Sequence, residues 1–498
     1  MRGRVLLAAV LTVAGLATVL ARSNPGASAD IQLQLGTLLA AEGRYREAAR
    51  AFKKAGREVE PRLRLPIASG LVLALLRSGE FAEARDEAEA LVGDLPSNAF
   101  AKALLGDALW ASGLFDEAER SYRNALAASP EDARARHGLA RALAARSRLD
   151  EAMIEAQAAL TLAPRDGEFH YTVGAIYERM HRFEAAANAF AGYLNLLPNR
   201  DRSEKAAWAR AQIKFLRAFK DKRPFLIDGD AETMLHTVPF KLIRDKVVVS
   251  GKVNGGGAMD FVLDTGAEQT ILSDTVARRA GITPITYVQS AGVGEVGLRG
   301  LQIGRIGQLQ FGTLRIHDVP CLIKNPPLGG LPTRETEAFS PLALGLSMII
   351  DYERRTLTIG RRITMTPEIE LPLRLHRLAM VRGIVNSRPA SFVIDTGGEV
   401  ISISQATAGS LQTDPTARKI PLKVYGTSGW DRDAFLLPNV DLEFASIRFS
   451  RIPVVVLNLR APSALLGFEL GGIVGHRFLS KYRVGIDLER STLALTAN

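Results

Sequence analysis

The 498-residue sequence contains a single cysteine, Cys321, so no disulfide can form within the chain. Aromatic residues account for only 6% of the chain, while apolar residues make up 47% and charged residues 23%, which are values typical of a globular protein. The formal net charge is +10, but no dense basic run and no basic patch interleaved with aromatic residues is present. This distribution argues against nucleic-acid binding and favours an arginine-rich, solubilising surface.

Several catalytic motifs are also missing. The sequence has no His-Glu-x-x-His, no Gly-x-Ser-x-Gly and no cysteine–histidine arrangement, which argues against zinc proteases, serine hydrolases and cysteine proteases. His137, His170 and His181 do not have the spacing of metal ligands, and we interpret them as surface or packing residues. We therefore predict neither a metal nor a cofactor.

Long apolar runs are absent except at the N-terminus. Arg2 and Arg4 precede an uncharged apolar run over residues 5–21, and the small residues 27–29 follow it. This order is typical of a secretory signal. The run is about 17 residues long, which is at the limit of what spans a bilayer, so an uncleaved membrane anchor remains an alternative. We assign residues 1–29 to this segment and expect the rest of the chain to be extracytoplasmic, either periplasmic or secreted.

From about residue 29 to residue 200 the sequence repeats with a period of 34 residues, and three consecutive copies end at Pro130, Pro164 and Pro198. With the helix that follows, the predicted helical array covers residues 30–220. Two positions of the repeat hold small residues in all three copies, and a third position holds an aromatic residue in two of them. The three sets are Gly106, Ala140 and Gly174; Ala118, Ala152 and Ala186; and Tyr122, Ala156 and Phe190. Two more degenerate copies precede them. The segment 203–219 is predicted to be a solvating cap helix.

This pattern resembles the tetratricopeptide repeat, in which small residues let two antiparallel helices approach and aromatic residues fill the space between them. A generic helical bundle with alanine-rich faces is the alternative, but a fixed period over five copies disfavours it. The resemblance implies an all-α solenoid whose concave face binds a protein partner.

After a predicted linker at residues 221–234, the sequence becomes rich in short runs typical of strands. The motif Phe-Val-aliphatic-Asp-Thr-Gly occurs twice there, with its aspartates at Asp264 and Asp395. Hairpin turn signals precede the two aspartates, at residues 254–255 and 386–387. We infer an internal duplication, with one half at residues 235–365 and the other at residues 366–498.

Further landmarks follow each motif. Glycine-bearing segments lie at residues 292–295 and 426–430, and a hydrophobic-Gly pair lies at Leu344-Gly345 and at Val474-Gly475. Gly345 is six residues before Asp351, whereas Gly475 is twelve before Asp487. This difference predicts that the short helix expected at residues 476–482 is trimmed in the first half.

The duplicated halves resemble two retropepsin-type lobes fused in one chain, as in aspartic proteases of the pepsin/retropepsin superfamily. The resemblance covers about half of the chain and implies an all-β, two-lobed domain with its site formed within one chain. It implies that Asp264 and Asp395 are catalytic. Its other implied site residues are the dyad supports Thr265, Gly266, Thr396 and Gly397, and the flap residues Gly292, Val293, Gly294, Gly426, Gly429 and Trp430.

Two carboxyl groups a few ångströms apart cannot both ionise cheaply, so one keeps a proton while the other is charged. The charged group can take a proton from a water molecule while the protonated group donates to a peptide carbonyl. We therefore expect an aspartic endopeptidase that acts on a peptide or protein substrate, with the helical array recruiting a protein partner.

The second motif departs from the first, because Gly398 and Glu399 follow it where the first has Ala267. An extra carboxylate beside the dyad would either perturb its titration or face solvent. Two alternatives to the enzyme remain open. In one, the β domain is a catalytically silent module that grips an extended peptide, and in the other the array carries the main function.

Overall fold

The computed structural model describes residues 25–56, 60–197, 203–220, 222–229, 234–294, 298–324, 337–411, 419–426 and 428–498. By packing, the chain divides into two compact units, residues 1–138 and 139–498. Helix α8 (Ala133–Ala145) spans the division between them. The first unit is helical, and the second combines further helices with the strands.

The predicted N-terminal signal lies largely outside the described residues, which begin at residue 25. Residues 25–29 of that segment form the start of helix α2 (Pro25–Ala41), where Ala29 is buried. Within the described ranges, no helix has both the length and the apolar character needed to cross a bilayer.

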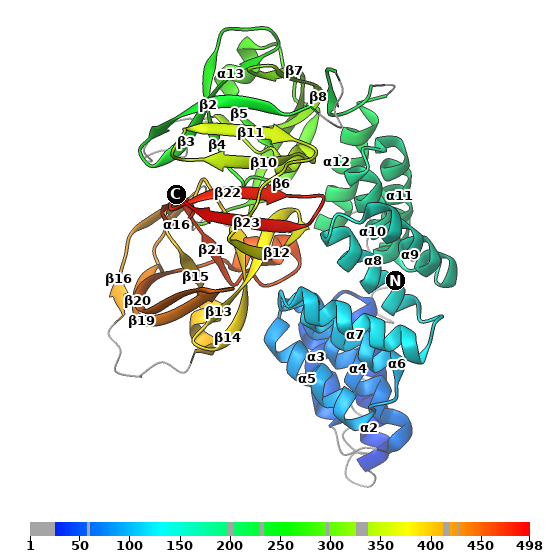
Figure 1. Ribbon diagram of the computed structural model, residues 1–498. Helices are drawn as coiled ribbons and strands as arrows, with labels where there is room; N and C mark the ends of the chain where they lie inside the picture. Colours follow the sequence, from blue (N-terminus) through cyan, green and yellow to red (C-terminus); the bar gives the residue numbers. More distant parts are fainter. Residues whose placement is uncertain are drawn as a thin grey trace. The chain divides into compact units, whose positions relative to one another are not determined.

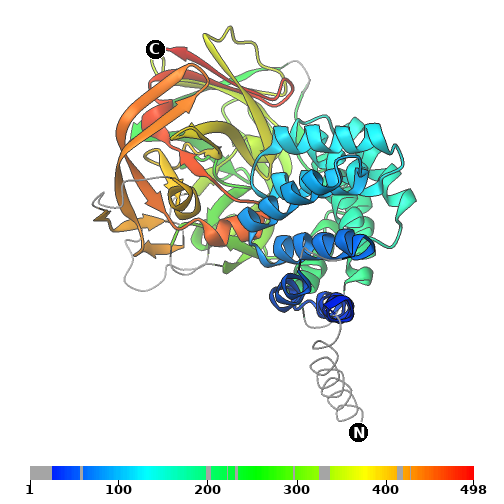
Figure 2. The same cartoon turned by 90° about the horizontal axis from the view of Figure 1, so that it is seen from below.

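Helices of the first unit follow one another as hairpins, drawn in blue to cyan in Figures 1 and 2. After α2 these are α3 (Tyr45–Ala55), α4 (Pro61–Ser78), α5 (Phe81–Asp94), α6 (Ala99–Ala111) and α7 (Phe115–Ala128). The small residues of the repeat lie against aromatic rings, as predicted. A Cβ on Gly106 would come 2.4 Å from the ring of Tyr122, and one on Gly70 would come 2.6 Å from the ring of Phe52. Glycine at these places lets the helices approach closely enough for the rings to fill the gap.

The second unit begins with α9 (Leu149–Leu162), α10 (Gly167–Arg179), α11 (Phe183–Leu196) and α12 (Glu204–Arg217). Ser203 caps α12 by accepting a hydrogen bond from the main-chain N–H of Ala206 at 3.1 Å, so the helix starts where predicted. Pro198, which the repeat pattern placed at the end of the last copy, lies outside the described residues.

The last helix faces solvent on one side only, because part of its apolar face is covered by the β domain. Phe215 and Phe219 are each 1% exposed, and they pack in one apolar cluster with residues of the β domain. Those partners are Leu301 and Ile303 on β7 (Leu298–Phe311) and Leu322 on β8 (Leu314–Lys324). The charged residues of the helix, among them Lys205, Arg210 and Lys214, are exposed, while the C-terminal end of its apolar face covers the neighbouring strands.

Part of the predicted linker joins the β domain as well. Strand β1 (Leu226–Ile227) pairs with β8, with Ile227 opposite Ile316. The ring of Phe225 lies 4.6 Å from that of His181 and 6.2 Å from that of Phe183. Residues 221 and 230–233 of this stretch lie outside the described residues.

The two halves of the β domain, called lobe one (residues 235–365) and lobe two (residues 366–498) below, have matching strands. Lobe one contains β2 (His236–Ile243), β3 (Lys246–Val253), β4 (Met259–Leu263), β5 (Thr270–Ser273), α13 (Asp274–Arg279), β6 (Thr286–Ala291), β7, β8, β9 (Glu337–Phe339), η1 (Leu342–Leu344), β10 (Ser347–Asp351) and β11 (Thr356–Gly360). Lobe two contains β12 (Ile369–His376), β13 (Leu378–Val385), β14 (Arg388–Ile394), β15 (Ser402–Ser404), α14 (Gln405–Ser410), β16 (Ile420–Pro421), β17 (Val424–Gly426), β18 (Gly429–Asp431), β19 (Phe435–Phe444), β20 (Ile447–Leu457), α15 (Arg460–Leu466), β21 (Gly472–Val474), α16 (His476–Leu479), β22 (Tyr482–Asp487) and β23 (Thr492–Ala497).

Each predicted turn joins the strands that lead to its aspartate. Asn254 and Gly255 connect β3 to β4 with φ of 49° and 72°, and Asn386 and Ser387 connect β13 to β14 with φ of 44° and 66°. Two consecutive residues with positive φ fit the right-handed twist of a hairpin, which is why these residue types occur there. Both turn predictions are confirmed.

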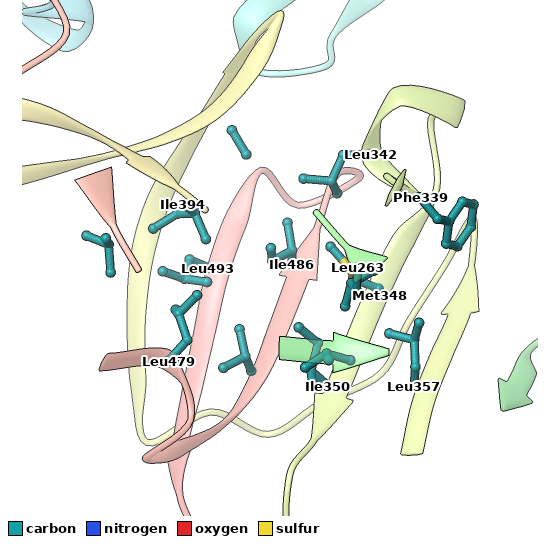
Figure 3. Close-up of a cluster of buried hydrophobic side chains, with 14 of the residues drawn as sticks. Leu263, Phe339, Leu342, Met348, Ile350, Leu357, Ile394, Leu479, Ile486 and Leu493 are labelled. Carbon is teal, nitrogen blue, oxygen red and sulfur yellow. The ribbon is translucent and has the colours of Figure 1, made fainter. Parts of the chain in front are cut away.

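The lobes meet in a shared antiparallel sheet. Its strands run in the order β2, β11, β10, β22, β23, β12, so each lobe contributes its first strand and its last two. Across the junction Met348 pairs with Ile486 and Ile350 with Val484. Figure 1 shows β22 and β23 in red between the strands of the two lobes, and Figure 3 shows Leu263, Met348, Ile394 and Ile486 gathered in the apolar core over this sheet.

The prediction that lobe one is trimmed near its end is wrong. Strand β4 lies parallel to β9, with Leu263 opposite Phe339, just as β14 lies parallel to β21, with Ile394 opposite Val474. Ser340 therefore occupies the place of Gly475, and the short helix η1 takes the place of α16. Gly345, which the sequence pattern matched to Gly475, instead ends η1 with a φ of 71°. The mismatch arose because the lobe-one copy has serine where the pattern expects glycine.

Candidate active site

Asp264 and Asp395 follow directly after two equivalent strands, β4 and β14. The main-chain N–H of Asp264 donates to the carbonyl of Phe339 at 2.9 Å, and that of Asp395 donates to the carbonyl of Val474 at 3.0 Å. Each aspartate is thus the last residue held by the parallel pairing of its lobe. The buried apolar runs before them fix the strands in the core and leave the carboxyl groups at the junction between the lobes.

The threonines of the two motifs hold the lobes together. The Thr265 N–H donates to the Thr396 Oγ1 at 3.1 Å, and the Thr396 N–H donates to the Thr265 Oγ1 at 3.0 Å. Each hydroxyl then donates across the interface, from Thr265 to the carbonyl of Ile394 at 2.6 Å and from Thr396 to that of Leu263 at 2.7 Å. Because both threonines are at most 1% exposed, these reciprocal bonds fix the two loops relative to one another.

The glycines of the motifs let the opposite carboxyl groups come close. A Cβ on Gly266 would lie 2.6 Å from the Cγ of Asp395, and one on Gly397 would lie 2.8 Å from the Cγ of Asp264. Any side chain at either place would collide with the carboxyl group of the other lobe. The structure thus brings together the six residues predicted for the dyad and its support.

The two carboxyl groups do not accept the same hydrogen bonds. The Oδ1 of Asp264 accepts one main-chain bond, from Gly266 at 3.0 Å. The Oδ1 of Asp395 accepts two, from Gly397 at 2.8 Å and from Gly398 at 2.9 Å. Gly398, noted in the sequence as a departure, therefore supplies an additional donor to Asp395, while the side chain of Glu399 faces solvent.

Burial raises the pKa of both aspartates. The pKa of Asp264 rises to about 7, first because the group is buried and then because of the negative charge of Asp395; the Gly266 N–H and Lys324 oppose this. The pKa of Asp395 is also raised by burial, against the opposing effect of the Gly398 and Gly397 N–H groups and of Lys246. A buried pair of this kind shares one proton at neutral pH.

The two predicted flap segments are hairpins whose tips meet. β6 pairs with β7 in lobe one, and β17 pairs with β18 in lobe two. The Ser428 N–H donates to the carbonyl of Val293 at 2.9 Å. A Cβ on Gly426 would come 2.3 Å from that carbonyl oxygen, and one on Gly294 would come 2.3 Å from the main-chain carbon of Ser428. The glycines thus allow a direct backbone contact between the hairpins.

Of the other flap residues, Gly292 lies at the end of β6, and Gly429 and Trp430 lie on β18. The ring of Trp430 is 5.3 Å from that of Tyr425 on the paired strand. Glu295 and Thr427 lie outside the described residues.

Sequence reasoning missed two cations near the dyad. The Nζ of Lys246, at the start of β3, donates to the carbonyl of Gly397 in the opposite lobe. Lys324, at the end of β8, lies close enough to Asp264 to affect its ionisation. The one available signal was a charged residue opening the apolar run 247–249, and that signal does not point to a particular partner.

Among the described residues, no cluster of three or more histidine, cysteine or acidic side chains is arranged to hold a metal ion. Cys321 is fully buried in lobe one, and burial raises the pKa of its thiol to about 12. A thiol of this kind is an apolar packing group rather than a nucleophile.

Comparison with protein families gives two matches. Residues 249–347 and 381–470 match the aspartyl protease family, one segment in each lobe. Residues 33–99, 69–119 and 103–167 match the tetratricopeptide repeat. A search of curated proteins finds no match to this chain.

Several solved structures are similar to the helical part. A thermophilic TPR protein from Thermus thermophilus is 21% identical, with a TM-score of 0.33, over 38% of this chain and 99% of that one. MamA from Desulfovibrio magneticus is 22% identical, with a TM-score of 0.26, over 35% of this chain and 97% of that one. The pilF protein of Pseudomonas aeruginosa is 14% identical, with a TM-score of 0.29, over 40% of this chain and 87% of that one.

The repeat match agrees with the observed helical hairpins, and the protease match covers both loops that carry the Asp-Thr-Gly motif. The chain therefore carries a tetratricopeptide-repeat array followed by an aspartyl protease-like β domain.

Proposed function

We propose that the β domain is an aspartic endopeptidase in which Asp264 and Asp395 form the catalytic dyad. The observation that carries this proposal is the reciprocal threonine bonding, which holds two partly buried carboxyl groups against the glycines of the opposite lobe. A binding module needs no second buried carboxyl group, since burying such a group without a use only lowers stability.

In the proposed reaction, the charged carboxylate takes a proton from a water molecule while the water oxygen attacks the peptide carbonyl carbon. The protonated carboxyl group donates its proton to the carbonyl oxygen, giving a neutral tetrahedral intermediate. When the C–N bond breaks, the carboxyl group that took the proton from water gives it to the leaving nitrogen, and the other carboxylate takes a proton from a hydroxyl group of the intermediate. An acid and an amine are released, and the dyad returns to its starting state.

We propose that the substrate is an extended peptide held beneath the two hairpins. The contact between Val293 and Ser428 joins the hairpin tips, so a chain longer than the site enters only when that contact opens. A single main-chain hydrogen bond between hairpins contributes about 1 kcal/mol, which suits a lid that opens readily.

For the array, the tetratricopeptide match supports protein–protein interaction, and we propose that its concave face recruits a protein partner or the substrate. The N-terminal pattern, with Arg2 and Arg4 before the apolar run 5–21, supports an extracytoplasmic location. Pull-down with the full-length protein tests the first proposal, and cell fractionation tests the second.

The enzymatic proposal is tested with a peptide library incubated with purified protein at about pH 3 to 7, the range in which such dyads titrate. We expect pepstatin-sensitive cleavage by the wild type and none by Asp264→Asn or Asp395→Asn. Peptide binding without cleavage by the wild type would instead identify a silent binding module.

A further inference from the structure

The pseudo-symmetry of the lobes gives each aspartate a matched position from the opposite lobe. Val249 pairs with Phe261 and Val381 pairs with Phe392, which are the equivalent residues three before each aspartate. Counting back along β3 and β13, Lys246 corresponds to Leu378. One lobe therefore places a cation where the other lobe places an apolar side chain.

From this position the side chain of Lys246 reaches across the interface between the lobes. It is half-buried, and its ammonium group donates to the carbonyl of Gly397, two residues after Asp395. The N–H of the same Gly397 donates to the Asp395 carboxylate. The lysine thus holds the loop that presents Asp395 and brings its positive charge close to that carboxylate.

The main chain favours the same aspartate. Gly398 donates to the Asp395 carboxylate at 2.9 Å, and a Cβ there would lie 3.0 Å from the Oδ2 of Asp395. The Gly398 N–H also donates to the main-chain carbonyl of Asp395 at 3.2 Å, whereas the equivalent Ala267 N–H in lobe one donates to the main-chain carbonyl of Asp264 at 3.3 Å. Hydrogen bonds to an ionised carboxylate favour the charged form, so two donors favour it more than one.

Other charged groups surround the dyad. Lys324 on β8 acts on Asp264 and opposes the asymmetry. His476 on α16 donates its main-chain N–H to the carbonyl of Gly398, and burial lowers the pKa of its ring, so the ring is uncharged at neutral pH. Asp245 is exposed beside Lys246, and Glu399 is exposed beyond Gly398. Glu268, four residues after Asp264, is neutralised by Arg377, whose Nε lies 2.6 Å from its carboxylate.

Lys324 is the cation that favours the ionised form of Asp264. The ionised form of Asp395 is favoured both by Lys246 and by a second main-chain donor. We propose that Lys246 is a positioning residue that fixes the Asp395 loop from the opposite lobe and keeps the negative charge of the resting dyad on Asp395. Asp395 is then the group that takes the proton from water, and Asp264 is the acid that donates to the peptide carbonyl. This inference rests on the proposed function of the dyad.

The test compares three full-length variants with the wild type. Lys246→Met removes the charge but keeps most of the length of the side chain, Lys246→Arg keeps the charge, and Leu378→Lys places a cation at the position in lobe two that is equivalent to Lys246. Two readouts are used: the pH profile of kcat/KM, and the titration of aspartate side-chain carbons labelled with ¹³C, with Asp395 and Asp264 assigned from the Asp→Asn variants. The second readout does not depend on cleavage.

In the wild type we expect Asp395 to lose its proton first. Lys246→Met should move the acid limb of the pH profile up by about one pH unit, a tenfold change in proton affinity, while Lys246→Arg leaves it near the wild-type position. Leu378→Lys should move the basic limb down. A change in kcat without movement of either limb would mean that Lys246 has only a structural role.

The proposal is overturned if Asp264 ionises first in the wild type, or if the acid limb of Lys246→Met stays in place. If the wild type cleaves nothing, the proposed function fails, yet the order of carboxyl titration still decides whether Lys246 places the charge on Asp395. A Lys246→Met protein that does not fold leaves Lys246→Arg and Leu378→Lys to decide the question.

Discussion

Single residues at the junction of the lobes determine both the geometry and the charge of the dyad. Thr265 and Thr396 supply hydroxyls that satisfy main-chain groups of the opposite lobe, and Gly266 and Gly397 leave space for the opposite carboxyl groups. Burial then makes it costly for both aspartates to be charged, and the pKa of Asp264 rises to about 7. Holding the two carboxyl groups in this way lowers the stability of the folded state at neutral pH.

A stability measurement follows from that cost. Because the folded-state pKa of Asp264 lies above its unfolded value, the folded state retains the proton while the unfolded chain releases it near pH 4, so stability is lost as the pH rises from about 4 to about 7. Asp264→Asn removes this loss of stability. The unfolding free energy of the variant relative to the wild type should therefore increase by up to about 4 kcal/mol between pH 4 and pH 8. Urea unfolding at a series of pH values measures it.

The control for this prediction is the exposed carboxylate of the same lobe, in Asp260→Asn, which should show no such growth. A difference between Asp264→Asn and wild type that stays constant with pH would contradict the raised pKa.

The threonine bonds give a second prediction at this scale. Thr396→Val keeps the shape of the side chain but leaves the Leu263 carbonyl and the Thr265 N–H buried without their partner. Each such loss costs about 1–3 kcal/mol, so we expect a fall of about 2–4 kcal/mol in unfolding free energy together with loss of cleavage. The control is Thr364→Val at an exposed position, which should change neither the unfolding free energy nor cleavage. If Thr396→Val has the stability and activity of the wild type, the threonine bonds do not hold the dyad.

At the scale of elements, strand pairing positions the two aspartates, and helix α12 packs against the lobe-one hairpin. The aspartates lie where β4 and β14 leave their parallel pairing with β9 and β21. Helix α12 places Phe215 and Phe219 against β7 and β8, so the base of the lobe-one hairpin shares an apolar core with the last helices of the array. The helical and β segments of residues 139–498 belong to one compact unit.

Phe219→Ala tests that packing. The ring of Phe219 is 1% exposed and lies 4.7 Å from that of Phe183, and its removal should cost about 3–5 kcal/mol. We expect amide hydrogen exchange to rise in α12 and also in β6 and β7. Phe468→Ala, a buried ring in lobe two, should raise exchange in lobe two instead. Faster exchange limited to α11 and α12 would refute a shared core.

The sequence allowed the dyad loops, the hairpin turns at Asn254 and Asn386, and the repeat helices to be predicted, because each depends on a local pattern. The prediction that Gly345 matches Gly475 was wrong, because Ser340 takes the place of that glycine in lobe one. For the same reason η1 was not recognisable as the equivalent of α16. The contacts of Lys246, of β1 and of Phe215 in α12 are made with residues far away in the chain. Such contacts leave no periodic signal, so only the folded structure reveals them.

At the scale of the whole molecule, duplication lets a single chain supply both lobes of a site that would otherwise need two subunits. The central sheet takes its strands from both lobes, and the dyad lies over it with one carboxyl group from each. Duplication also freed the copies to diverge, which is why Lys246 has Leu378 as its counterpart and Ala267 has Gly398. The two carboxyl groups can therefore take different roles permanently, whereas identical subunits would have to share them.

The central claim is that the paired carboxyl groups hydrolyse peptide bonds. Its most direct test is cleavage-site profiling of a peptide library by the wild type and by Asp395→Asn, purified side by side, with and without pepstatin. The account predicts a set of cleaved bonds that disappears in Asp395→Asn and in the presence of the inhibitor. Peptides left intact by a folded wild-type protein across about pH 3 to 7, or cleavage that survives in Asp395→Asn, would contradict it.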